Sequence, residues 1–332
     1  MYMRNFLSLL AFALTVLFTA CSPKTGAVVA KTGAAETNPV PAAEPSYAPS
    51  ETDTALLWRI SGPGVSQESY LFGTIHIIPE EDYFLPKGMV AALNDSDEVV
   101  FEIDPRQMQD PMAIMGLMSK INMRGDTSLE DLLPKEEYDE VAAYFNASGM
   151  PFFIFKKMKP LFLSAMVGQD IQAMQEGGGM DAAGTKSYEL EMTKLAKAAD
   201  KKITGLETMD FQLSLFDSIP YRGQAEMLYE AVRADKAGEN DEGENEMDRI
   251  VNMYKRKAIA EMAGSISEEG KGISRFEELL LTRRNKSWVP LIEAKIKGDA
   301  PKLFAVGAAH LGGEKGVIAL LRQEGYTVTP EF

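Results

Sequence analysis

The chain has 332 residues, of which 45% are hydrophobic and 25% charged, a composition typical of a globular protein with one large or two modest domains. Its 49 acidic and 34 basic residues give a formal net charge of −15, which would repel phosphate backbones and excludes nucleic acid as an expected partner. The single cysteine excludes an intramolecular disulfide or a Cys-rich metal site. Only two histidines, His76 and His310, are available as imidazole ligands or bases.

Residues 1–20 are predicted to be a signal peptide. Arg4 precedes an apolar run over residues 6–18, which has the length of a signal-peptide core and is short for a membrane span. The run ends in Thr-Ala-Cys, and small residues before a lone cysteine resemble a bacterial lipoprotein cleavage site. Cys21 would then be the lipid-modified first residue of a membrane-anchored lipoprotein of the cell envelope, on its periplasmic or surface face. An ordinary secretory signal and a transmembrane anchor are the alternatives.

Residues 21–54 are predicted to be a flexible linker between this lipid and the folded domain. The segment is rich in Ala, Pro, Thr and Ser and shows no apolar periodicity. Such a sequence buries too little apolar surface to offset the entropy lost on ordering. The folded domain is expected over residues 55–332.

The start of this domain is predicted to be a β-hairpin followed by a βαβ unit. Strands are expected at residues 56–60 and 70–73, separated by the turn sequence Ser-Gly-Pro-Gly. The second strand runs into Gly-Thr-Ile-His, and a helix near residues 87–93 and a strand at 98–103 follow. This order of strand, Gly-x-x-His, helix and strand has the length of one βαβ unit.

The same order recurs at the end of the chain. A strand at residues 302–306 leads into Gly-Ala-Ala-His, a helix is expected at 315–323, and a closing strand at 326–329. The region between the two units has mostly helical periodicity, interrupted by a short strand at 203–206. The predicted fold class is therefore α/β, with a central mixed β-sheet, flanking helices and a helix-rich middle.

Both histidines have a glycine three residues upstream, Gly73 before His76 and Gly307 before His310. Glycine makes up only 27 of the 332 residues, so chance does not readily explain this match. A glycine at a strand end permits unusual dihedral angles and close backbone approach, and it can present the imidazole at the carboxyl edge of the sheet. Open α/β sheets bind ligands at that edge. A purely structural role for each histidine is the alternative.

Two acidic residues are predicted to lie at the same edge. Glu102 is near the end of the strand at 98–103, and Glu207 ends the short strand at 203–206. Two imidazoles with one or two carboxylates suit one divalent ion, Mn²⁺, Co²⁺, Fe²⁺ or Zn²⁺, with open positions for water. Such a water loses its proton near neutral pH, and a second carboxylate can serve as general base. Surface or salt-bridge carboxylates are the alternative interpretation.

The combination of these motifs resembles the TraB/PrgY/GumN family, which includes the Tiki proteins and is more distantly related to erythromycin esterase and ChaN-like proteins. The resemblance covers nearly all of the chain from Leu56 to the C-terminus. It rests on the order and spacing of the segments at residues 70–76, 101–102, 159–160, 179–181, 205–208 with Gln212, 284–285 with Trp288, and 306–311 with Gly313.

The resemblance implies a site and a set of roles. Tiki proteins look like metal-dependent proteases, which implies metal ligation by the matching His76, His310, Glu102 and Glu207, with a catalytic role for the two glutamates. The motif positions Gly73, Thr74 and Gly307 would contact the substrate or shape the backbone. Arg284 and Asn285 match the family's Arg-Asn pair, which would orient a carboxylate or stabilise an oxyanion, or else form a salt bridge and a helix-end hydrogen bond. Asp181 would support a ligand or cap the helix that follows it.

Three functions remain open at this stage. The first is a lipid-anchored metallohydrolase that cleaves a peptide bond or another amide or ester. The second is a non-catalytic lipoprotein that holds a peptide, haem or a metal ion in the same cleft, since family neighbours bind peptide pheromones and haem. The third is a structural envelope lipoprotein with degenerate motifs. A Ser-His-Asp hydrolase lacks support, because no Gly-x-Ser-x-Gly accompanies either histidine. The oligomeric state is not predicted.

Overall fold

The computed structural model describes residues 46–109, 116, 120–168, 184–238, 246–267 and 278–331. The predictions for the signal peptide, for lipidation of Cys21 and for Asp181 therefore lie outside the described residues.

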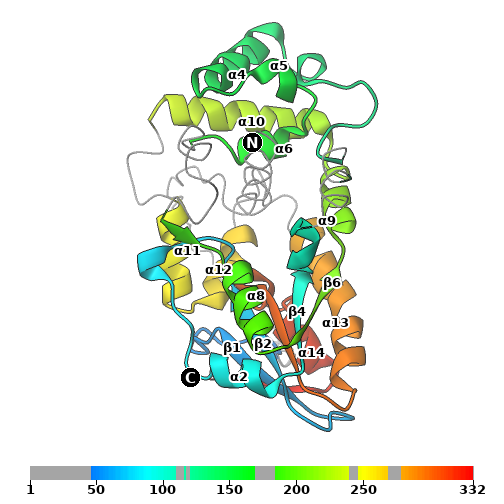
Figure 1. The fold of residues 1–332 in the computed structure, drawn as a ribbon. Coiled ribbons are helices and arrows are strands. Elements are labelled where there is room, and N and C mark those ends of the chain that lie inside the picture. The colour runs from blue at the N-terminus through cyan, green and yellow to red at the C-terminus, as the bar shows by residue number, and fades with distance from the viewer. Residues whose placement is uncertain are drawn as a thin grey trace, which may run out of the picture.

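The central element is a six-stranded sheet in the order β6-β4-β7-β2-β1-β8 (Figure 1). The first four strands of this order are parallel to one another, and β1 is antiparallel to both β2 and β8. The strands are β1 (Leu57–Ser61), β2 (Ser69–Thr74), β4 (Glu98–Ile103), β6 (Lys202–Glu207), β7 (Lys302–Gly307) and β8 (Thr327–Glu331). A separate pair joins β3 (Ile78–Pro79) to β5 (Thr185–Lys186).

The α/β fold class predicted from the sequence is confirmed, including the hairpin of β1 and β2 and the two Gly-x-x-His units. The central strand β4 is almost wholly buried and has an apolar centre, Val99 to Phe101, as expected for a parallel strand covered on both faces. The two units lie side by side, because β2 pairs directly with β7 and places Thr74 opposite Gly307.

Helices surround the sheet and also build a separate helical half, which Figure 1 shows at the end of the molecule opposite to the sheet. The helices near the sheet are α2 (Met89–Asp95), α8 (Tyr188–Ala198), α11 (Glu246–Lys255), α12 (Ile259–Ser267), α13 (Arg283–Ile296) and α14 (Val317–Gln323). The helical half contains α4 (Lys135–Ala147), α5 (Phe152–Phe155), α6 (Pro160–Ser164), α9 (Met209–Phe216) and α10 (Tyr221–Lys236). Short helical turns complete the chain: η1 (Glu80–Asp82), η2 (Pro105–Gln109), η3 (Leu129–Asp131), the π-helical η6 (Glu278–Thr282) and η7 (Ala308–His310).

Local sequence fixes where the helices next to the site begin. Ser187 caps α8 by accepting a hydrogen bond from the backbone of Leu190, and Thr208 caps α9 in the same way through Phe211. The α8 cap directly follows β5 of the two-stranded pair. The first turn of α8 lies beside the end of β2 in the six-stranded sheet. That turn carries an acidic residue, Glu189, toward the end of β2.

Two apolar clusters stabilise the molecule, one around the sheet and one within the helical half. Trp58 and Trp288 are fully buried in the first cluster, and the stacked rings of Phe145 and Phe152 belong to the second. Every described residue of both clusters lies between Ala55 and Val328, so the described residues 46–54 contribute no side chain to either cluster. Within the described ranges, no helix is both long and apolar enough to cross a membrane.

Helices α8 and α13 contact opposite faces of the sheet. Thr74 is level with Gly307, and Phe101 is level with Ala305 two residues earlier, so Thr74 is in step with Phe101 and one position out of step with Glu102. Successive residues of a strand point to opposite faces. Accordingly, Thr74 binds a residue of α8, whereas Glu102 binds a residue of α13.

Candidate active site

Four neighbouring strands end at one edge of the sheet, and the predicted site residues lie there. Glu207 ends β6, Glu102 precedes the last residue of β4, and Gly307 ends β7. His76 follows β2 by two residues, and His310 ends the short turn η7 that follows β7. The structure therefore brings both histidines and both glutamates to the carboxyl edge of the sheet, where α/β folds bind ligands.

His310 is held in one tautomer by its neighbours. The Asn285 side-chain amide donates to the carbonyl of Lys315 at 2.9 Å, which directs its oxygen to His310 Nδ1 at 2.6 Å. Arg284 Nη1 lies 3.1 Å from His310 Nε2, and an arginine can only donate. His310 therefore carries its proton on Nδ1, and its Nε2 lone pair accepts the hydrogen bond from Arg284. The Trp288 ring packs against the imidazole at 4.5 Å between centroids.

Arg284 joins the two glutamates in the interior of the site. Its Nη2 donates to Glu102 Oε2 and to Glu207 Oε1, the latter at 2.6 Å, and its Nε donates to Glu207 Oε1 at 2.9 Å. The second oxygen of Glu207 accepts from Trp288 Nε1 at 3.0 Å, and that of Glu102 accepts from the Gly307 backbone N–H at 2.7 Å. With 1% of its side chain exposed, Arg284 is positioned to act on these carboxylates and not on a ligand from solvent.

These contacts set the charge states on the α13 side of the sheet. Burial alone would raise the pKa of Glu102, but the positive charge of Arg284 outweighs it and holds the pKa well below its ordinary value. Burial, together with the positive charges of Arg284 and His76, lowers the pKa of His310 to about 3 against the opposing effect of Glu102. Burial works against the charge of Arg284, but the two glutamates keep its pKa above the ordinary value. At neutral pH, Glu102 is ionised and His310 is neutral.

His76 has a partner that the sequence did not reveal. Its Nδ1 lies 2.9 Å from Glu189 Oε1, and the same oxygen accepts from Thr74 Oγ1 at 3.1 Å. The other oxygen of Glu189 accepts from Ser187 Oγ at 3.0 Å. The sequence signal for Glu189 is weak, because an acidic residue in the first turn of a capped helix usually only complements the helix dipole.

His76 has the opposite charge state to His310. Burial alone would lower the pKa of His76, but the charge and hydrogen bond of Glu189 raise it to about 9. Burial would raise the pKa of Glu189, and the neighbouring His76 lowers it. His76 is therefore protonated at neutral pH. Its side chain is 25% exposed and that of Glu189 is 24% exposed, so solvent reaches the cluster on this side.

Gly73 and Gly307 allow neighbouring groups to pack closely against the backbone, and they do not adopt unusual backbone angles. Neither has a positive φ, which differs from one part of the sequence-based explanation. A Cβ on Gly73 would lie 2.9 Å from Leu311 Cδ1, and one on Gly307 would lie 3.3 Å from Glu102 Oε1. The carbonyl of Gly73 also accepts from the buried Tyr254 hydroxyl at 2.9 Å. Side chains at these positions would separate the histidine turns from the sheet.

The donor atoms of the cluster do not form a metal centre in this arrangement. Among the residues that the structure describes, no three His, Cys, Asp or Glu side chains are arranged to hold a metal ion. Arg284 lies where a cation would have to contact Glu102, Glu207 and His310 together. The predicted ligands thus fit a metal ion only if Arg284 withdraws from them.

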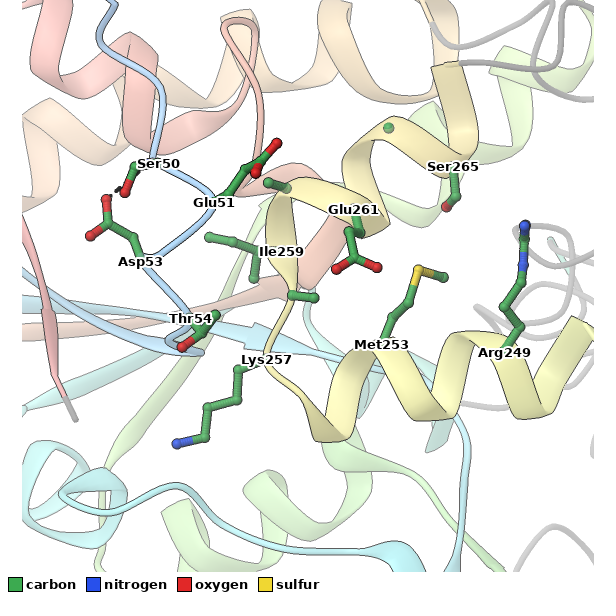
Figure 2. A pocket seen from close by; sticks show the side chains of 13 residues that line it. Ser50, Glu51, Asp53, Thr54, Arg249, Met253, Lys257, Ile259, Glu261 and Ser265 are labelled. Carbon is green, nitrogen blue, oxygen red and sulfur yellow. Dashed lines mark hydrogen bonds between the residues drawn. The ribbon is translucent and has the colours of Figure 1, made fainter.

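A cavity of about 560 Å³ lies elsewhere, between residues 50–54 and the helices α11 and α12 (Figure 2). Figure 2 shows acidic and basic side chains along its wall, including Glu261 and Lys257. It contains none of the predicted site residues, so the candidate active site is distinct from this cavity.

The fold and site define a class of α/β proteins with two Gly-x-x-His turns at the carboxyl edge of one sheet. The profile of the TraB/PrgY/gumN family matches residues 56–330, and the chain belongs to this family. No solved structure shows a significant match to the chain.

Curated relatives carry the name metalloprotease. The chain is 21% identical over 320 residues to metalloprotease TIKI2 of Danio rerio, covering 82% of this chain and 60% of the relative. It is 22% identical over 306 residues to metalloprotease TIKI2 of Xenopus tropicalis, covering 78% and 57%, and 21% identical over 326 residues to metalloprotease TIKI1 of Danio rerio, covering 82% and 62%. The chain thus spans about three fifths of the length of these relatives.

Proposed function

We propose that this protein is a hydrolase that cleaves a peptide bond or another amide or ester bond. The observation that carries the proposal is the meeting of His76, His310, Glu102 and Glu207 at the carboxyl edge of four neighbouring strands. Family membership and the metalloprotease relatives support the same reaction class.

The charge states of His76, His310 and Glu102 suit them to different roles in such a reaction. His76 is protonated at neutral pH and partly exposed, so it is suited to donate a proton to the leaving group or a hydrogen bond to the substrate carbonyl. On the other side of the edge, the neutral His310 and the ionised Glu102 are acceptors, and Arg284 and the Gly307 N–H occupy them in this arrangement. Two groups whose pKa values are driven apart in this way are typical of acid and base partners.

A divalent metal requirement is part of the proposal, and the relatives' names are what support it. The described arrangement itself does not fit a metal ion, because Arg284 occupies the carboxylates. The metal predicted from the sequence, one ion of Mn, Co, Fe or Zn, therefore requires a direct measurement.

A second candidate is a non-catalytic protein that binds a peptide or haem at the same edge. It is favoured by one observation: the side chains of Glu102, Glu207 and Arg284 are fully engaged with one another and with neighbouring groups. Such a satisfied polar network is also a feature of stable binding scaffolds.

We further propose that the protein is anchored to the cell envelope through lipid on Cys21. Metabolic labelling with a palmitate analogue tests this directly. Label in the wild type and none in Cys21→Ser is the expected result, and equal labelling of the two proteins would contradict the proposal.

The hydrolase proposal is tested with a lipid-free chain that begins at residue 22 and contains every described core residue. Metal content is measured by elemental analysis, and cleavage of a broad peptide library is measured with and without added Mn²⁺, Co²⁺, Fe²⁺ and Zn²⁺. We expect about one equivalent of metal and a loss of cleavage of about a hundredfold or more in both His76→Ala and His310→Ala.

The exposed Glu130→Gln in the helical half is the control, because it changes a polar side chain of a surface ion pair outside the candidate active site. Unchanged cleavage in both histidine variants would contradict the catalytic proposal. A wild type that cleaves nothing but retains a peptide or haem, with retention lost in His76→Ala, would establish the binding function instead.

A further inference from the structure

Two of the most exposed large apolar side chains in the described chain are neighbours on one short helix. Phe153 is 74% exposed and Ile154 is 61% exposed, both on α5. Figure 1 shows α5 with α4 at the end of the molecule furthest from the sheet. This pair, the α5 tip, therefore projects from the protein at a distance from the candidate active site.

The α5 tip rests on a well-packed base. Phe152 is buried and stacks on Phe145 at 5.6 Å between centroids, and its backbone N–H donates to Asn146 Oδ1 at 3.0 Å. Phe155 packs against the core of the helical half. The inward side chains on both sides of the tip hold Phe153 and Ile154 outward, so little further ordering is needed for them to meet a surface.

The surroundings of the tip suit an interfacial location. Lys156 and Lys157 directly follow helix α5. Lys156 Nζ lies 3.1 Å from Glu130 Oε2, and Lys157 Nζ lies 3.0 Å from Asp126 Oδ1. Residues 120–168 carry six basic and seven acidic residues, so this region is nearly neutral within a chain of net charge −15. An anionic bilayer would therefore repel this nearly neutral region only weakly.

The predicted lipid anchor on Cys21 would keep the domain close to a bilayer. Twenty-four residues lie between the predicted lipid site Cys21 and the first described residue, Ser46, and a chain of that length reaches at most about 85 Å. A tether of that length holds the domain at a high effective concentration over the membrane. Two partly inserted apolar side chains then suffice to orient it.

We propose that the α5 tip inserts into the interfacial layer of the lipid bilayer and orients the domain on the membrane, with its sheet half directed away from the lipid. This inference rests on the proposed lipid anchor and is independent of the proposed hydrolase activity. It names a second, non-covalent contact with the membrane.

The experiment uses the same lipid-free chain from residue 22. It lacks Cys21, the single cysteine of the sequence, so an introduced cysteine is the one site for a dye. Its binding to vesicles of phosphatidylethanolamine and phosphatidylglycerol is measured by co-sedimentation. We expect weak binding by the wild type and a loss of about tenfold or more in Phe153→Ser with Ile154→Ser. Binding should persist at high salt, because it depends on apolar insertion and not on surface charge.

The matched control is Val90→Ser with Leu291→Ser, which removes two apolar side chains that are 53% and 44% exposed on the sheet half. It should bind vesicles as the wild type does. A second readout places an environment-sensitive dye on Ile154→Cys or on Leu291→Cys. A blue shift with vesicles is expected for the first and not for the second.

Several results would overturn the inference. They are no vesicle binding by the wild type, equal binding by the tip variant, or loss of binding at high salt. Self-association of the wild type that is lost in the tip variant, without vesicle binding, would assign the tip to a second copy of the chain. Peptide cleavage by the tip variant should equal that of the wild type, and palmitate labelling of Cys21 tests the anchor separately.

Discussion

His76 and His310 occupy equivalent places in two similar sequence motifs, yet they differ in charge at neutral pH. The difference comes from the helix that each one faces. Glu189 on α8 raises the pKa of His76 to about 9, whereas burial beside Arg284 on α13 lowers the pKa of His310 to about 3. A repeated motif therefore supplies the position of an imidazole, and the partner supplies its chemistry.

At the residue scale, Glu189→Gln should lower the pKa of His76 by more than about one unit, because the variant removes the charge that opposes the effect of burial. An NMR titration of the imidazole signals measures the change, and the two histidines are assigned with His310→Ala. The pKa of His310 should stay low.

The control for this measurement is Glu191→Gln, two residues along α8, where the carboxylate pairs with Lys194 at 2.6 Å and not with His76. It should leave the His76 titration nearly unchanged. An equal shift in both variants, or none in Glu189→Gln, would show that Glu189 does not control His76.

At the element scale, the position of the His310 turn depends on close packing between helix α12 and the residues after His310. A Cβ on Gly312 would lie 2.3 Å from the carbonyl oxygen of Ile259 and 3.0 Å from Ala263 Cβ. Rigid backbone on both sides leaves no room for a methyl group. On the other side of His310, a π-helical turn, η6, directly precedes Arg283 and Arg284, and such turns are frequent at functional sites.

We predict that Gly312→Ala destabilises the protein by about 2 kcal/mol or more, because α12 or the His310 turn must move. The matched control is Gly264→Ala within α12, where a Cβ meets nothing within 4 Å. That variant should stabilise the protein by about 0.5 kcal/mol through helix propensity. Urea unfolding measures both, and equal stability of the two variants would disprove the packing argument.

At the scale of the whole molecule, the sequence predicted the parts of the fold that depend on local pattern. Apolar runs located strands such as β4 and β7, and the Gly-x-x-His spacing located the edge where His76 and His310 lie. The family resemblance led to the expectation that Arg284 orients a carboxylate or forms a salt bridge, but the specific partners across that edge were not predictable. Glu189 meets His76 across 113 positions, and Arg284 meets Glu102 across 182, so neither contact leaves a periodic signal in the sequence.

The same partnerships shape the pH dependence of folding, and the two histidines act on opposite sides of neutrality. The folded pKa of His76 is about 9 against an ordinary 6.5, so its stabilisation is complete below pH 6.5 and is lost as the pH rises through 9. The folded pKa of His310 is about 3 against 6.5, so below pH 6.5 the unfolded chain gains a proton that the folded chain does not take up. Its effect is a loss of stability that grows as the pH falls toward 3.

We therefore predict that the free energy of unfolding is greatest near pH 6.5 and falls on both sides, as measured by urea unfolding from pH 4 to 9. His76→Gln should flatten the alkaline side, because the raised pKa is removed, and should leave the decline on the acidic side. The comparison stays below pH 10, where tyrosines of the unfolded chain begin to ionise. If the wild type and His76→Gln lost stability equally between pH 6.5 and 9, the pairing of His76 with Glu189 would contribute nothing to folding.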